Sequence, residues 1–227
     1  MTWPLTADDL APILLSVRVA ATATLIDLPL AAAFAWLLAR RWFAGKSLLD
    51  ALAHVPLVLP PVATGYILLV LLGREGPIGA PLARIGVVFA FHWTGAAIAC
   101  AVMAFPLMVR PIRLSIEAID PEVDDAARTL GASSWMRLTR VTLPLAAPGL
   151  IAGAVLGFAR ALGEFGATIT FVAAIPGETL TLPSAIWLAT QSPGEETRAL
   201  ALCGVSLAIA LAAIFAADAV SRRLTRS

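Results

Sequence analysis

Long uncharged apolar runs alternate with short polar segments along most of this chain. Three windows, residues 51–73, 85–109 and 199–217, contain no Asp, Glu, Lys or Arg. A bilayer core needs about 20 apolar residues per helix, so each window is long enough to span it. Two further apolar runs carry only isolated charges. The pattern predicts five spanning helices, at about 12–39, 51–72, 85–109, 148–172 and 199–218.

These runs favour an all-α integral membrane protein that forms one domain over residues 1–227. Strands of a membrane barrel would alternate apolar and polar residues, and the runs do not. Charged residues make up 14% of the chain, compared with about 25% in soluble domains. Cys100 and Cys203 both lie in apolar windows, so the sequence predicts neither a disulfide framework nor a metal site.

The basic residues predict the orientation of the chain, because Lys and Arg favour cytoplasmic loops. Eleven of the 16 fall on one side of the predicted spans: Arg40, Arg41, Lys46, Arg110, Arg113, Arg128, Arg137, Arg140, Arg222, Arg223 and Arg226. We therefore expect the N-terminus outside, the C-terminus in the cytoplasm, and a cytoplasmic loop at about 110–147 between spans three and four.

That loop has the pattern of two short helices joined at a glycine. Asp120 is suited to cap a helix that begins at Pro121. An apolar stripe follows, and Gly131 stands where a helix end favours a left-handed residue. A second short helix is predicted from Ser133 or Ser134. Helices this short are marginal in water, so they should pack on something, either the membrane surface or another protein. Two alanines in the stripe favour protein, because a lipid-facing stripe would favour larger apolar residues.

The spacing within this loop resembles the EAA loop of ATP-binding-cassette (ABC) importer permeases. It differs from the usual pattern in Asp125 for Glu and Val141 for Ile. The resemblance implies a type I ABC importer transmembrane fold, with a coupling helix that docks on a separate ATPase subunit. This chain would then be a non-catalytic pore subunit that binds no cofactor, and ATP and Mg²⁺ would belong to the partner. The residues predicted to couple to the ATPase are Asp125, Ala126, Ala127, Gly131, Leu143 and Pro144.

Arg160 and Glu164 are a second signal, because both stand inside predicted span four. Charges at membrane depth cost about 2.5–3.5 kcal/mol each on insertion scales. One explanation is an ion pair between positions i and i+4. The other is that both face the pore or its gate, where Arg160 would attract an anion. Gly163 and Gly166 would permit a close helix contact or a break, and Thr168 would add a hydroxyl donor.

Two shorter features of the sequence concern a possible translocation path. Pro60 and Pro61 should break span two, since proline cannot donate the helical hydrogen bond. The break is expected either beside the translocation path or as a simple structural kink. Residues 183–191 are too short to span and are expected to form a re-entrant or periplasmic helix.

Several segments resemble the oxyanion branch of the ABC permeases, and the molybdate permeases in particular. They are residues 57–66, 72–77, 104–110, 160–167, 175–177 and 181–183. The resemblance implies a homodimer in the bacterial inner membrane that works with two ATPase subunits and a periplasmic molybdate-binding protein. Sulfate, thiosulfate or tungstate is the alternative cargo. An ion-driven secondary transporter or channel is the alternative class. A membrane enzyme is disfavoured, because no catalytic constellation is evident, and no nucleic-acid partner is expected.

Overall fold

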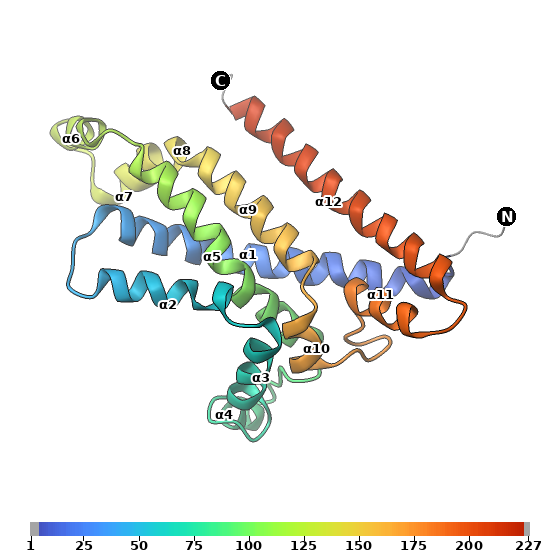
Figure 1. Ribbon diagram of the computed structural model, residues 1–227. Helices are drawn as coiled ribbons and strands as arrows, with labels where there is room; N and C mark the ends of the chain where they lie inside the picture. Colours follow the sequence, from blue (N-terminus) through green and yellow to red (C-terminus); the bar gives the residue numbers. More distant parts are fainter. Residues whose placement is uncertain (1–4, 225–227) are drawn as a thin grey trace.

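The computed structural model describes residues 5–224 of this chain, and that part is built from helices (Figure 1). Three helices are long and apolar enough to cross a membrane. They are α1 (Leu10–Arg40), α5 (Trp93–Glu117) and the Glu196–Ala216 stretch of α12 (Glu196–Leu224). Arg226 and the side chains of Arg222 and Arg223, which entered the orientation argument, lie outside the described part.

Two further spans exist only if each of two bent helix pairs is counted as one. α2 (Lys46–Val58) meets α3 (Pro61–Leu72) at 111°, and the stretch Ser134–Leu145 meets α9 (Ala147–Leu162) at 68°. The predicted continuous span at 51–72 is therefore two helices, because Pro61 starts a new helix at its first position. The predicted span at 148–172 is also interrupted: α9 ends at Leu162 and α10 (Gly166–Val172) follows.

The third predicted span is shifted along the sequence relative to the helix. α5 begins at Trp93 rather than near 85, because the side chain of His92 caps it by accepting a hydrogen bond from the Thr94 amide. It also continues beyond 109 to Glu117, where Arg113 donates to Glu117 one turn away. Hydropathy marks apolar length and not the cap, so it could not place either end.

α1, α5 and α9 pack together as the core of the molecule. Their contact surfaces consist largely of small residues. On α9, Gly149, Gly153 and Gly157 recur every four residues and face α5. A Cβ added at Gly153 would lie 3.0 Å from Ile112 Cγ1, and one at Gly157 would collide with Met108 Sδ. The backbone of α9 thus approaches α5 as closely as glycine alone permits.

Short helices complete the chain at the two ends of this core. α4 (Gly79–Arg84) follows α3, and α6 (Pro121–Thr129), α7 (Ser134–Arg137), the π-helical turn η2 (Leu138–Thr142) and α8 (Leu143–Leu145) connect α5 to α9. α11 (Leu182–Gln191) occupies the predicted short segment at 183–191 and packs against α12 and α1. Its first amide, on Leu182, donates to Ser16 Oγ of α1 at 2.6 Å.

Asp9 anchors the start of α12 to the start of α1. Asp9 ends the short helix η1 (Ala7–Asp9), and its carboxylate accepts from Arg198 Nη2 at 2.7 Å and from the Thr6 amide at 2.8 Å. Burial alone would raise the pKa of Asp9, but the hydrogen bonds from Arg198 and Thr6 outweigh it and hold that pKa below its ordinary value. The carboxylate stays ionised at neutral pH and keeps the two helix ends together.

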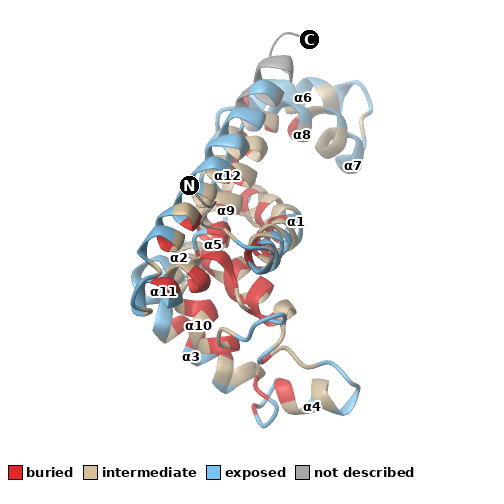
Figure 2. Cartoon of the chain, turned by 90° about the vertical axis from the view of Figure 1, so that its right-hand side faces the viewer, coloured by how far each residue is buried: buried red, intermediate tan, exposed pale blue. Residues whose placement is uncertain are grey.

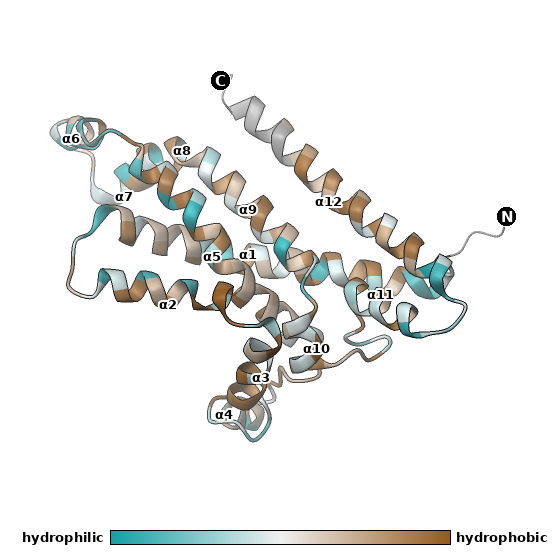
Figure 3. Ribbon diagram, viewed as in Figure 1, coloured by the Kyte–Doolittle hydropathy of each residue, from teal (hydrophilic) through white to brown (hydrophobic). Residues whose placement is uncertain are grey.

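Apolar side chains also cover much of the outer surface. Figure 2 shows α12 largely exposed, and Figure 3 shows hydrophobic residues along α12 and α3. Large exposed residues on α12 include Leu200, Leu207 and Phe215. Contiguous apolar surface of this kind is unfavourable in water and suits a lipid or protein environment.

Replacing Gly153 with Leu should destabilise the bundle, because the new side chain must push α9 away from α5. The expected loss is about 1–3 kcal/mol, the usual cost of overpacking. Thermal unfolding of the purified protein in detergent measures it. Gly204→Leu is the matched control, since a Cβ at Gly204 on α12 meets no neighbouring atom within 4 Å. Equal melting temperatures for the two variants would contradict a close α9–α5 contact.

Candidate functional site

The break predicted at Pro60 and Pro61 lies against the break between α9 and α10. Gly166, the first residue of α10, faces Pro61, the first residue of α3; a Cβ at Gly166 would lie 2.7 Å from Pro61 Cβ. One turn further along α3, a Cβ at Gly65 would collide with the carbonyl oxygen of Ala167. Segments about a hundred residues apart thus cross in backbone contact. We call this contact of α3 with α10, together with the loop Gly163–Phe165, the break junction.

Within the break junction, Glu164 connects α9 to α10. Its Oε2 lies 2.6 Å from Arg160 Nη1, and its Oε1 accepts a hydrogen bond from the Ala167 amide at 2.7 Å. The Glu164 side chain is 1% exposed, whereas that of Arg160 is 26% exposed. One buried carboxylate therefore both neutralises Arg160 on α9 and satisfies a free amide at the start of α10. The i,i+4 ion pair, one of the two explanations that the sequence left open, is present.

The other predicted residues of this region divide into buried and exposed positions. Thr168 is buried, and its hydroxyl is 2.9 Å from the Phe165 carbonyl, to which it donates. Its one proton is thereby committed to the backbone in this conformation. Pro60, Pro61 and Gly163 are exposed. The break junction therefore reaches the protein surface at the α2–α3 break and at the α9–α10 break, while Glu164 and Thr168 are buried.

Two unpaired polar atoms lie in α1 and α3, and sequence reasoning gave neither a role. Asp27 is 4% exposed, and its Oδ2 has no hydrogen-bond partner within the described chain; the same holds for Thr64 Oγ1. Arg18, the other charge inside α1, stacks over the Trp93 ring with its guanidinium carbon 3.7 Å from the ring centre. The charge inside an apolar run was the available signal for Asp27, but sequence could not show that it lacks a partner.

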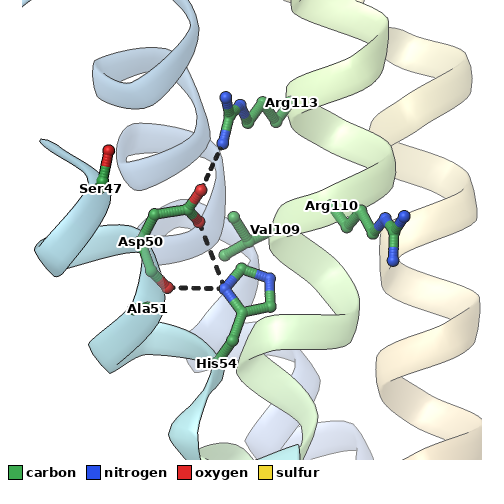
Figure 4. Close-up of a pocket in the computed structure, with 7 residues that line it drawn as sticks. All are labelled: Ser47, Asp50, Ala51, His54, Val109, Arg110 and Arg113. Atoms are coloured by element: carbon green, nitrogen blue, oxygen red, sulfur yellow. Dashed lines mark hydrogen bonds and ion pairs between the residues drawn. The ribbon is translucent and has the colours of Figure 1, made fainter.

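A further polar cluster connects α2 to α5 (Figure 4). Arg113 donates to Asp50 Oδ2 at 2.7 Å and to Glu117 Oε1 at 2.8 Å, and His54 Nδ1 lies 2.8 Å from the Asp50 carbonyl oxygen. Together with Ser47 and Arg110 these residues line a pocket of about 400 Å³. Sequence reasoning missed this cluster because its partners are 63 positions apart. It neutralises the charge of Asp50 where two apolar helices pack.

The segment predicted to couple to an ATPase forms α6 and the helical stretch after it. Asp120 Oδ1 accepts from the Glu122 amide at 2.9 Å, and Pro121 is the first residue of α6. Gly131 has φ +83°, the left-handed conformation expected at the helix end. Ser133 Oγ accepts from the Met136 amide at 3.2 Å and so caps the next helix.

This segment exposes an apolar surface. Leu130 is 88% exposed and Trp135 is 72% exposed. On α6 itself, Ala126 is exposed and Ala127 half-buried. The salt bridge from Arg137 Nε to Asp124 Oδ1, at 3.1 Å, holds α6 to the stretch that follows it.

The predicted coupling residues lie on two different helices. Leu143 and Pro144 are on α8, whereas Asp125, Ala126 and Ala127 are on α6. Leu143 and Pro144 start α8, and Ala146 separates α8 from α9. The motif therefore does not form one patch. Its first half presents an exposed helix, and its second half connects that helix to the central bundle.

Comparison with known proteins identifies relatives over nearly the whole chain. Residues 28–226 match the family described as binding-protein-dependent transport system inner membrane component. The chain is 52% identical over 219 residues to the molybdenum transport system permease protein ModB of Escherichia coli K12, which covers 96% of each chain. It is 36% identical over 192 residues to the sulfate transport system permease protein CysT of the same strain, which covers 85% of this chain and 69% of the relative.

Solved structures share the same fold at low sequence identity. A bacterial ABC transporter involved in the import of alginate matches with a TM-score of 0.78 at 18% identity, covering 97% of this chain and 81% of that one. The MetNI methionine ABC transporter matches with a TM-score of 0.68 at 17% identity, covering 99% and 97%. The helical arrangement is thus that of ABC importer membrane subunits, and this chain belongs to the family of binding-protein-dependent transport system inner membrane components.

Proposed function

We propose that this chain is the permease subunit of an ABC importer that carries molybdate across the bacterial inner membrane. The observation that carries the cargo assignment is the 52% identity to a molybdenum transport permease over 96% of both chains. Identity to a sulfate transport permease is 36% over a shorter stretch. ATP hydrolysis would belong to a separate ATPase subunit, and this chain would move the cargo.

The proposed working form is a homodimer with two ATPase subunits and a periplasmic molybdate-binding protein. The exposed apolar faces of α12 and α3 support contacts with a second copy and with lipid. A related structure, the alginate ABC transporter, is described in complex with a substrate-bound periplasmic protein. The excess of basic residues around α6 supports a cytoplasmic position for that helix, with the N-terminus outside.

We assign coupling to α6, with Asp125, Ala126, Ala127 and Gly131 facing the ATPase. Exposed Leu130 and the small Ala126 permit close helix-to-protein packing there. Leu143 and Pro144 would transmit the movement of α6 into α9. Such a lever suits a bundle with two discrete arrangements.

The break junction is the proposed translocation path or gate. Irregular backbone at membrane depth is tolerated where protein or water covers it, and Pro60, Pro61 and Gly163 expose such backbone. Arg160 keeps part of its side chain exposed beside the junction, where its charge would attract an anion. Glu164, Gly166 and Thr168 would hold the two helices that form the path.

Gly131→Asp should uncouple transport while leaving the protein folded and inserted. The substitution puts a side chain and a negative charge at the end of the exposed α6 surface, so molybdate uptake should fall by about tenfold or more, the equivalent of 1.4 kcal/mol of lost docking energy. ATP-dependent uptake of labelled molybdate into proteoliposomes holding the assembled transporter measures it.

Gly45→Asp is the matched control for this experiment. Gly45 has φ +89° and, like Gly131, no atom within 4 Å of an added Cβ, so both substitutions carry the same backbone strain. Only Gly131→Asp should lose uptake. Equal uptake by the two variants would show that the α6 surface does not couple transport to ATP hydrolysis.

Replacing both Arg160 and Glu164 separates a structural ion pair from a role in the path. Arg160→Ala alone strands a buried carboxylate, which costs about 3–5 kcal/mol in a fully buried pair and less here because Arg160 is partly exposed. The double variant Arg160→Met with Glu164→Gln removes both charges and should recover stability. If Arg160 acts on the anion, the double variant should melt near the parent temperature yet transport at about a tenth of its rate or less. Parental uptake would restrict the pair to a structural role.

The cargo is tested by competition. Uptake of labelled molybdate by the assembled transporter, with its own binding protein, should be suppressed by unlabelled molybdate at a lower concentration than by sulfate. Stronger suppression by sulfate would transfer the assignment to the sulfate permeases. Uptake by the chain without its ATPase would indicate an ion-driven transporter or channel instead.

A further inference from the structure

A basic pocket lies between the end of α1 and the segment that begins with α6. Its volume is about 420 Å³, and it is lined by Arg40, Arg41, Arg128, Arg137, Ser134 and Thr142, among other residues. The arginines come from three places in the chain: two from the α1 end, one from α6 and one from α7. Figure 1 shows α7 beside that end of α1. We call this site the arginine pocket.

Positive charge in the arginine pocket exceeds the negative charge that lines it. Asp124 is the one carboxylate among the lining residues, and it accepts from Arg137 Nε at 3.1 Å. Arg128 pairs with Asp125 at 3.1 Å, but both of these side chains are largely exposed, so that pair is weak.

The two arginines from α1 make no ion pair with a carboxylate in the described chain. Arg40 Nη2 donates to the Ile119 carbonyl at 3.3 Å, and the Arg41 guanidinium lies 5.6 Å from the centre of the Trp36 ring. The lining therefore combines four guanidinium groups with one carboxylate, so its positive charge is in excess.

The lining matches the chemistry of a phosphate-type oxyanion. A tetrahedral oxyanion offers acceptor oxygens in several directions, and guanidinium groups meet such oxygens with paired hydrogen bonds. Hydroxyls on Ser134 and Thr142 add neutral donors to the same cavity.

We propose that the arginine pocket binds a phosphate-type oxyanion and thereby braces α6 against the end of α1. The bound anion would accept hydrogen bonds from arginines at the α1 end and from arginines of the α6–α7 segment. It would therefore hold these two elements together, although both place positive charge in the pocket. The proposal concerns this chain's own residues and does not depend on which cargo is carried or on the role of α6 in coupling.

Two sources supply the same chemistry: a free inorganic oxyanion and the phosphate of an anionic lipid headgroup. Trp36 and Arg41 at the end of an apolar helix are typical of residues at headgroup depth. The experiment therefore includes a separate arm for each source.

The first arm measures thermal stabilisation of the complete, detergent-purified chain by inorganic phosphate, with ionic strength matched by sodium chloride because exposed charges are screened by salt. A ligand that binds the folded state raises the melting temperature in a saturable way. Arg41→Gln removes one charge at the α1 end of the pocket, and Arg128→Gln removes one on α6. Each should weaken apparent phosphate affinity by about tenfold, as expected for one lost charge-assisted hydrogen bond. Arg140→Gln is the control: it is an exposed arginine of the same segment outside the pocket.

The second arm measures lipid retained by the chain after transfer from bilayers of phosphatidylglycerol or phosphatidylcholine, by native mass spectrometry. Loss of retained phosphatidylglycerol in Arg41→Gln and Arg128→Gln, but not in Arg140→Gln, identifies the headgroup as the source. A variant-dependent response to phosphate alone identifies a free anion. The proposal is overturned if neither probe separates the two pocket variants from the parent, or if Arg140→Gln loses binding equally.

Discussion

The buried carboxylate of Glu164 is the interaction on which the central architecture depends. A helix that stops inside the bundle leaves carbonyls and amides without partners, and in an apolar surrounding each costs as much as a lost hydrogen bond. Glu164 offsets part of this cost by accepting from the Ala167 amide, and it offsets the charge of Arg160 with its other oxygen. Because both oxygens are used, the acid can be buried without being stranded. These two contacts stabilise the break between α9 and α10 at Glu164.

Glycine then permits the second break to lie against the first. Gly166 and Gly65 remove the side chains that would keep α3 and α10 apart. Pro61 is the first residue of α3, a position whose amide has no hydrogen-bond partner within the helix, so proline is tolerated there. The hydrogen bond of Glu164 at the α9–α10 break and the glycines on both helices thus occur at the same contact.

Local chemistry made several parts of this arrangement predictable from sequence. The cap at Asp120, the left-handed Gly131 and the break at Pro60 and Pro61 each depend on one or two neighbouring residues, which the sequence displays directly. The i,i+4 pair of Arg160 with Glu164 is local too. By contrast, the facing of Pro61 and Gly166, the link from Asp50 to Arg113 and the assembly of the arginine pocket depend on tertiary packing. Hydropathy misplaces the ends of α5 for a related reason. The His92 cap lies at its start and the Arg113–Glu117 ion pair in its last turn, and hydropathy detects neither.

Continuity of the chain gives the proposed coupling a physical route. α9 has 16 residues and is therefore about 24 Å long. One of its ends follows directly from α8, with Leu143 and Pro144, and its other end carries Arg160 and leads into Glu164. Its glycine stripe brings its backbone directly against the side chains of Ser115, Ile112 and Met108 of α5, so the two helices are in close contact along this length. A displacement applied through α6 and η2 would therefore reach the break junction through one rigid element. The π-helical turn at Leu138–Thr142 and the 68° bend before α9 are the points along this route where backbone geometry departs from a straight helix, so they are where a change of angle would be absorbed.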